Sequence, residues 1–326
     1  MKNILVTGGT GFIGSNLAIH LTELGYSVRI LRRKNSDLRA IQDADVEHRI
    51  GNVTDPESLA SAMRECDTVF HTAAIVSFWR KMYNLQQQVN VVGTRNVVNA
   101  CLASGIETLV HTSSVAAIGF TPEGTLASED TPYNWGGTTG YKYSKFVAEQ
   151  EVQAGVAKGL RAVIVNPTVV VGERDIHFHG GQLVVDIKRG RVPFFIKGGM
   201  NVVYVGDVVK GEIQAALKGR TGERYILGGE NLTHKDIFQR TAAIVGGRAP
   251  ITELPIPILK GAAAAVELVA TLINRRPWLT RDLVAGAGRR NWFTTEKAIH
   301  ELGHTATSFD ETIRGAYEWY RDNGFL

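Results

Sequence analysis

The sequence predicts an α/β protein built on a Rossmann-type, doubly wound parallel sheet with helices on both faces. Short apolar, β-branched runs alternate with segments of helical length and periodicity through the first half of the chain. This alternation is typical of a parallel sheet buried on both sides. A glycine-rich turn joins the first expected strand to the first expected helix. With 326 residues, 44% of them hydrophobic, the chain is long enough for such a unit and a smaller, mostly C-terminal lobe.

The expected elements follow in order along the chain. The expected strands are short apolar runs at residues 3–7, 27–31, 46–49, 68–71, 108–112 and 162–166, with further strands at 202–205 and 225–227. The expected helices are 12–24, 56–65, 83–103 and 141–157. We therefore expect a dinucleotide-binding domain over residues 1–172, with 201–228 adding to the same sheet. Residues 173–200 and 229–326 should form mainly a substrate lobe and C-terminal helices, with the active cleft at the carboxyl ends of the strands.

Charge and cysteine content bound the partners and the setting. The formal net charge is +4, and the basic residues are scattered apart from runs at 32–34 and 188–191. No nucleic-acid partner is indicated, because short basic runs are most simply solvated surface. Cys66 and Cys101 fall in expected helices and require no disulfide. A cytoplasmic location is expected, and the first residues show no signal-peptide pattern.

The most apolar later stretch is 256–273. Lys260 and Glu267 interrupt it, so no integral membrane segment is expected. We interpret it as a mostly buried helix; the alternative is a peripheral membrane or lipophilic-ligand role.

The glycine turn gives the first functional signal. Gly8, Gly11 and Gly14 are spaced three apart, and Gly9 with the last two also satisfies G-x-G-x-x-G. Such a turn lets the backbone approach a pyrophosphate at a helix N-terminus. The alternative is a plain glycine turn, but the strand before it and the helix after it favour a dinucleotide site.

The tip of the second strand indicates which dinucleotide is bound. An acidic residue there would bind the ribose hydroxyl of NAD, but Arg32, Arg33 and Lys34 stand at this tip instead. Guanidinium groups pair well with phosphate, so NADP is preferred over NAD. The alternative is a solvated basic loop in a protein that still accepts NAD.

Several motifs together make the chain resemble an extended short-chain dehydrogenase/reductase. These are "TGGTGFIG" at 7–14, "HTSS" at 111–114 and "YKYSK" at 141–145, with further matches at 67–74, 90–94, 166–172, 204–209 and 225–237. The likeness covers nearly the whole chain. It is greatest to the dihydroflavonol reductase-like branch of the epimerase/dehydratase family, which includes proteins labelled hopanoid-associated sugar epimerases.

The third motif supplies the candidate catalytic residues. Tyr141 and Lys145 are four residues apart and share a helical face, whereas Tyr143 has no lysine at that spacing. A nearby ammonium and the positively charged nicotinamide should both lower the phenol pKa from about 10, so that Tyr141 works as general acid or base. The resemblance assigns Lys145 to the nicotinamide ribose and Ser114 to the substrate oxygen. The alternative for each is a surface helix pair or a strand-end turn.

The resemblance also implies secondary cofactor contacts. They line the pyrophosphate turn, the adenine and the nicotinamide, and comprise Thr10, Phe12, Ile13, Asn52, Val53, Ala73, Ala74, Asn90, Ser113, Pro167 and Thr168. Asn52 stands where the family usually has aspartate, and an amide there can still contact the adenine amine. Asn90 has a structural role as its alternative.

Apolar and aromatic residues after the fourth strand and in the lobe are the substrate candidates. They are Ile75, Ser77, Phe78, Trp79 and Tyr83, with Phe178, Phe194 and Phe195. If several face the cleft, the ligand is substantially apolar; the alternative is that most are core. Family epimerases usually hold the sugar nucleotide with an arginine where this chain has Met200 and Asn201. Gly206 also replaces the usual acid.

The leading hypothesis is therefore an NADP-preferring reductase or alcohol dehydrogenase acting on an apolar small molecule. The alternative is an NAD-retaining nucleotide-sugar epimerase/dehydratase, and a third hypothesis is a non-catalytic dinucleotide-binding protein. Related proteins pair through helices beside the active-site helix, so a homodimer is an expectation.

Two histidine patterns are set aside. Residues 300–304 match the zinc motif H-E-x-x-H, but Gly303 should end the helix before the second histidine. His177 and His179 are expected in a loop at the cleft mouth. No metal site is predicted.

Overall fold

A single parallel sheet organises the first two thirds of the chain in the computed structural model, which describes residues 1–137 and 139–326. Its seven strands lie in the order β10-β6-β5-β4-β1-β2-β3, and all neighbours are parallel. They are β1 (Asn3–Thr7), β2 (Ser27–Arg32), β3 (Glu47–Ile50), β4 (Thr68–His71), β5 (Thr108–Thr112), β6 (Ala162–Pro167) and β10 (Arg224–Leu227). The predicted fold class is confirmed.

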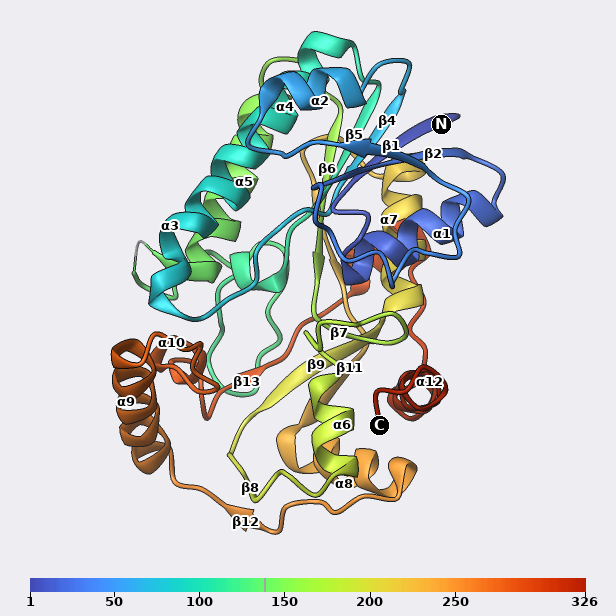
Figure 1. Cartoon of the computed structure of the whole chain (residues 1–326). Helices are drawn as coiled ribbons and strands as arrows, with labels where there is room; N and C mark the ends of the chain where they lie inside the picture. The colour runs from blue at the N-terminus through green and yellow to red at the C-terminus, as the bar shows by residue number, and fades with distance from the viewer. Residues whose placement is uncertain (138) are drawn as a thin grey trace.

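Helices cover both faces of this sheet, as the continuous apolar strands require (Figure 1). On one face α1 (Phe12–Glu23), α7 (Val205–Lys218) and α11 (Glu296–Leu302) share a buried core with side chains such as Ile4 and Val6. On the other, α2 (Pro56–Ala62), α4 (Gly93–Ser104) and α5 (Gly140–Val156) pack over Leu5 and Val69. Alternate residues of each strand therefore face opposite cores.

Local signals set the ends of several helices. Asp55 accepts a hydrogen bond from the Glu57 amide at the start of α2, and α4 ends at Gly105 with a left-handed φ of 66°. The predicted helix 83–103 is a composite. It begins as a short 3-10 turn (Arg80–Met82) and α3 (Tyr83–Gln86), continues as a π-helical segment (Gln87–Val92), and ends as α4.

A second, smaller sheet lies beyond the carboxyl ends of the main strands (Figure 1). Its strand order is β11-β9-β13, with β7 also paired to β9. These strands are β7 (Val169–Val171), β9 (Gly199–Tyr204), β11 (Glu230–Thr233) and β13 (Arg290–Asn291). Residues 201–228 are therefore divided: β9 belongs to this second sheet, whereas only β10 joins the main sheet. The division of the chain into a dinucleotide-binding part and a substrate lobe stays a prediction.

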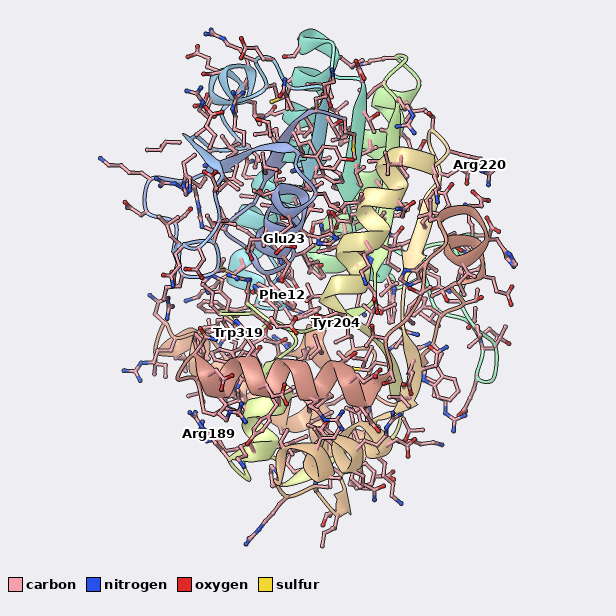
Figure 2. The ribbon with its side chains drawn as sticks, turned by 90° about the vertical axis from the view of Figure 1, so that its right-hand side faces the viewer. Phe12, Glu23, Arg189, Tyr204, Arg220 and Trp319 are labelled. Carbon is pink, nitrogen blue, oxygen red and sulfur yellow. The ribbon has the colours of Figure 1, made fainter. Side chains whose placement is uncertain are left out.

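Three helices pack against the second sheet. They are α6 (Gln182–Lys188), α8 (His234–Val245) and α12 (Phe309–Asp322), which share an apolar core centred on Phe309 and Tyr320. The helix α12 begins with a capping box between Ser308 and Glu311. Figure 2 shows α12, with Trp319, lying across the molecule below α1 and α7; Tyr204 immediately precedes α7.

The remaining segment is peripheral. A small two-stranded sheet, β8 (Phe194–Phe195) with β12 (Thr252–Glu253), leads into α9 (Ile256–Leu272) and then α10 (Arg281–Val284) at the edge of the molecule (Figure 1). The prediction that α9 is mostly buried is wrong: within this helix the buried residues are Leu259, Ala263, Glu267 and Ala270. Of the helices in residues 1–137 and 139–326, none combines the length and apolar character needed to cross a membrane.

Candidate active site

The glycine turn between β1 and α1 forms a close-packed cradle. The Gly11 amide donates a 2.8 Å hydrogen bond to the Gly8 carbonyl. Gly8 has a left-handed φ of 73°, and a Cβ atom there would lie 2.7 Å from the Ala73 amide nitrogen. A Cβ on Gly14 would collide with the Gly8 carbonyl oxygen. Glycine is thus required at Gly8 and Gly14, where the turn, α1 and the loop after β4 converge.

The N-terminus of α1 opens from this cradle. Gly11 precedes the helix without a capping side chain, and its first turn, Phe12–Ser15, carries no acidic residue. The backbone N–H groups and the helix dipole therefore offer a site for an anion. A pyrophosphate fits the residues present here, and the neighbouring Ala73 and Ala74 are small enough for the backbone to approach it.

The basic tip of β2 lies at the other expected end of the cofactor site. The Arg32 Nε atom donates a 2.8 Å hydrogen bond to His48 Nδ1. Burial, with Arg32 next in importance, lowers the pKa of His48, so the imidazole is a neutral acceptor. Arg33 and Lys34 are exposed. Their cationic groups are available to a phosphate ligand.

Asn52 and Val53 lie on the neighbouring loop after β3. The Asn52 Oδ1 atom accepts a 3.2 Å hydrogen bond from the Thr54 amide, so the side chain turns back toward its own loop. Val53 is buried and would contact a Cβ atom placed on Gly93 of α4.

Ser114, Tyr141 and Lys145 converge at the end of β5. Ser114 follows this strand directly, and its hydroxyl is close enough to Tyr141 to favour a lower pKa of the phenol. The same hydroxyl accepts a 3.1 Å hydrogen bond from the Ala116 amide. Tyr141 stands in the first turn of α5, just after Gly140, whose φ is 86°. Lys145, one turn later, donates a 2.8 Å hydrogen bond to the Thr112 carbonyl. The structure thus brings the three predicted residues together.

The electrostatics of the tyrosine differ from the sequence prediction. Burial raises the pKa of Tyr141 to about 12, and the Ser114 hydrogen bond opposes this only in part. Burial also lowers the pKa of Lys145 to about 8, against the attraction of Glu149 and Glu212. The protein's own groups therefore raise the pKa of Tyr141 and do not lower it as expected. Desolvation of the phenol outweighs the contact that favours the phenolate.

A buried polar network stands behind Ser114. Glu149 accepts hydrogen bonds from the Ser113 hydroxyl at 2.5 Å and from Asn166 Nδ2 at 2.7 Å, and Arg224 lies 3.3 Å from its other oxygen. The same Asn166 nitrogen donates to the Ser114 carbonyl at 2.9 Å. The Ser113 hydroxyl is thus committed to Glu149, and Glu149 helps to fix the backbone of Ser114.

Sequence reasoning missed Glu149, although a signal was present. Tyr141, Lys145 and Glu149 follow one another at intervals of four residues, which places all three on one face of a helix.

Asn90 stabilises the loop after β4. Its side chain accepts a 2.8 Å hydrogen bond from the Ile75 amide and donates to the Ile75 carbonyl at 3.1 Å and to Ser144 Oγ at 2.9 Å. These contacts connect the loop to α5 and favour the structural role that was the alternative for Asn90.

Thr168 faces the second sheet. Pro167 ends β6, and the Thr168 hydroxyl donates a 2.8 Å hydrogen bond to Asn201 Oδ1. Asn201 is 1% exposed, and its amide nitrogen donates to Gly229 and Asn231. The position at which family epimerases carry an arginine is therefore occupied by a buried, hydrogen-bonded amide.

The predicted substrate residues separate into two groups. The ring of Phe78 meets that of Tyr141 edge-on, with centroids 5.7 Å apart, and Ile75, Ser77 and Trp79 belong to the same loop. Phe178 instead stacks on Tyr320 of α12, at 5.5 Å between centroids. The Phe178 ring thus takes part in the packing of the lobe.

The side chains of the zinc-like motif at residues 300–304 make structural contacts. Helix α11 ends at Gly303, which has a left-handed φ of 71°, as predicted. Glu301 accepts hydrogen bonds from Arg220 and Tyr225, and His304 contacts the Gly228 carbonyl at 2.8 Å. Across residues 1–137 and 139–326, no group of three or more metal-binding side chains is assembled.

Comparisons with known proteins agree with this geometry. The model of the "NAD dependent epimerase/dehydratase family" matches residues 4–228. A relative from Synechocystis sp. named "Putative dihydroflavonol 4-reductase" is 35% identical, covering 98% of this chain and 95% of its own. "Sterol demethylase protein B" of Methylococcus capsulatus is 32% identical over 99% of both chains. The solved structure of gox2253 is 36% identical, covers all of both chains and superposes with a TM-score of 0.88.

Proposed function

The chain belongs to the NAD dependent epimerase/dehydratase family and is an NAD(P)-dependent enzyme of the extended short-chain dehydrogenase/reductase type, and from that premise we propose its reaction. It reduces a carbonyl, or oxidises a secondary alcohol, on a substantially apolar small molecule, and it prefers NADP. The convergence of Ser114 and Tyr141 beside Phe78 is the observation that carries the proposal.

The cofactor would be held by the glycine turn, the basic tip of β2 and Lys145. Gly8, Gly11 and Gly14 would cradle the pyrophosphate at the N-terminus of α1, and Arg33 and Lys34 would contact a 2′-phosphate. Lys145 would contact the nicotinamide ribose. When bound, the nicotinamide supplies the hydride donor or acceptor and, in its oxidised form, a positive charge.

The chain's own residues manage the proton. In reduction the Tyr141 hydroxyl donates its proton to the substrate oxygen, and in oxidation the phenolate accepts it. A phenol pKa raised to about 12 keeps Tyr141 protonated at neutral pH, which suits the reducing direction. Ser114 donates a hydrogen bond to the same oxygen as negative charge develops there. The Lys145 ammonium stabilises that charge and any phenolate formed.

An apolar substrate is supported by the surroundings of Tyr141. Phe78 packs against its ring, and Ile75 and Trp79 lie on the same loop. Two relatives are named "Putative dihydroflavonol 4-reductase" and "Sterol demethylase protein B", and a substrate of either named class, a dihydroflavonol or a sterol, would bring ring carbons to such a site. A nucleotide-sugar substrate is less well supported, because Asn201 is buried and its amide is already hydrogen-bonded.

The alternative, an NAD-retaining epimerase or dehydratase, remains within the matched family. Both functions would use Ser114, Tyr141 and Lys145, so the discriminating property is how the nucleotide is held. We would extract the purified protein for bound nucleotide and then titrate NADPH and NADH against it. Reversible, NADPH-selective binding is the expected result, and tightly retained NAD would overturn the reductase proposal.

A further inference from the structure

The outer face of α9 is unusually apolar for an exposed helix. Ile258, Leu268, Leu272 and Ile273 are 59%, 62%, 77% and 58% exposed. They recur at intervals that place them along one side of the helix. Trp278, which follows the helix, is 73% exposed. We call this set, together with Val269 at 55% exposure, the α9 face.

The charges around the α9 face are mostly positive, with the exposed Glu253 and the half-buried Asp282 just beyond its two ends. Between residues 254 and 281 the exposed charged side chains are Lys260, Arg275, Arg276 and Arg281. Glu267, the acidic residue of this stretch, is 3% exposed and lies 3.0 Å from Arg281 Nε. Arg281 is thus paired within the segment, whereas Lys260, Arg275 and Arg276 border the apolar surface with an excess of positive charge.

The helix is fixed to the body of the protein on its inner side. Leu259 and Ala263 are buried in an apolar cluster with Leu279. The Lys81 ammonium donates hydrogen bonds to Asn274 Oδ1 at 2.9 Å and to the Thr271 carbonyl at 3.3 Å. The exposed apolar residues are thus presented on a supported helix.

Its attachment places the α9 face near the candidate active site. Trp79 and Leu268 line a common cavity of about 240 Å³. Asp282 of α10 accepts a hydrogen bond from Tyr83. A Cβ atom on Gly140, the residue before Tyr141, would lie 3.1 Å from that aspartate. The α9 face and the loop that carries Phe78 therefore belong to one side of the molecule.

We propose that the α9 face docks on the surface of an anionic phospholipid bilayer. Leucine, isoleucine and tryptophan side chains would enter the boundary between headgroups and acyl chains, and the surrounding cations would contact lipid phosphates. A contiguous exposed apolar patch of this kind marks an interaction site. The proposal stands apart from the proposed reaction, because it concerns where the protein is held and not what it converts.

A second copy of this chain fits the α9 face less well. In a two-fold symmetric pair the same patch meets itself, so Lys260, Arg275 and Arg276 of both copies would gather at one interface. Glu253, the exposed acid beside this stretch, offers one negative charge per copy against these three cations. An anionic lipid surface satisfies both the apolar and the cationic part of the face.

Vesicle sedimentation tests the proposal on the full chain. Wild type should sediment with vesicles of phosphatidylcholine and phosphatidylglycerol in equal parts, and at least ~10-fold less with phosphatidylcholine alone. The variant L268E/L272E should lose binding, and R275Q/R276Q should weaken it roughly tenfold. The matched control is Leu217→Glu, which alters a leucine of α7 that is 50% exposed and should bind like wild type.

Other outcomes would overturn the proposal. Docking by this face would be excluded if wild type sediments with neither kind of vesicle, or if L268E/L272E binds as tightly as wild type. Sedimentation velocity tests the other occupant, a second copy of the chain. If wild type is a dimer that does not bind vesicles, and L268E/L272E is a monomer, the α9 face is a dimer interface. Unchanged unfolding midpoints would show that the variants are folded.

Discussion

The Lys145 ammonium donates a 2.8 Å hydrogen bond to the carbonyl oxygen of Thr112, at the last residue of β5. This contact joins the helix that carries Tyr141 to the strand that leads into Ser114. Both proposed proton-handling groups are therefore positioned by the same buried cation, which is 4% exposed. Moving Lys145, or removing its charge, should therefore change how Tyr141 and Ser114 lie relative to each other.

Lys145 should give carbonyl reduction an alkaline limit. Its pKa is lowered to about 8, so the cation is present below that pH and is lost as the pH rises through it. We expect kcat/KM for reduction to fall above about pH 8. Lys145→Met should reduce kcat/KM roughly a hundredfold and remove this limb. A wild-type profile that stays flat to pH 10 would contradict the assignment, since the Tyr141 pKa lies higher still.

Tyr141→Phe should abolish most of the turnover, by about 10²–10⁴-fold, because the substrate oxygen loses its proton donor. The ring and its contact with Phe78 are kept in this variant. Tyr143→Phe is the matched control on the same helix, where the phenol ring packs near Tyr133 and Phe146. Steady-state kinetics of both variants decide the question, and equal loss in the two would refute the assignment of Tyr141.

Arg33→Ala should weaken NADPH binding by about tenfold and leave NADH binding unchanged, because a charge-assisted contact to the 2′-phosphate is lost. Isothermal titration with the two nucleotides measures the difference. Arg49→Ala serves as the control, since Arg49 lies on the adjacent β3 and pairs with Glu47 at 2.6 Å. Parallel loss of both nucleotides would mean that Arg33 does not distinguish them.

Glu212 should make the protein less stable as the pH rises. Burial raises its pKa from 4.5 to about 8, so in that window the folded state retains a proton that the unfolded chain has released. Stability must then decrease with pH between these values and level off above about 8. Glu212→Gln cannot ionise and can still accept the 2.9 Å hydrogen bond from Thr112.

The free energy of unfolding of Glu212→Gln minus that of wild type should therefore increase by a few kcal/mol from pH 5 to pH 9. Urea unfolding at the two pH values measures this gain. Glu318→Gln, at an exposed position of α12, should show no comparable change. A constant difference between Glu212→Gln and wild type would mean that Glu212 does not titrate in this range.

Local periodicity made much of the site predictable from the sequence. The glycines of the β1–α1 turn are three apart, and Tyr141 and Lys145 are four apart, so each set is placed by one turn of backbone. The order of strands and helices in the main sheet follows from the same kind of signal. These features are set by residues only a few positions apart, so their pattern can be seen in the sequence.

Features that depend on distant partners were harder to predict. Strand β9 looked like its neighbours but pairs with β11, β13 and β7, a choice made by tertiary contacts. The pKa of Tyr141 rises because burial outweighs the opposing contact with Ser114, which follows β5 and not α5. The apolar composition of residues 256–273 predicts a buried helix, yet composition does not distinguish an inner face from an interaction surface.

The place of β10 at the edge of the main sheet has a consequence for biosynthesis. Its residues, Arg224–Leu227, pair with β6, which ends at Pro167, so a ribosome releases β6 well before its outer neighbour. In the interval the nascent sheet has an unpaired edge that includes the apolar Ile164 and Val165. If the first half folds during translation, the intermediate exposes this edge and is prone to aggregate. Chains that end before residue 224 should therefore aggregate.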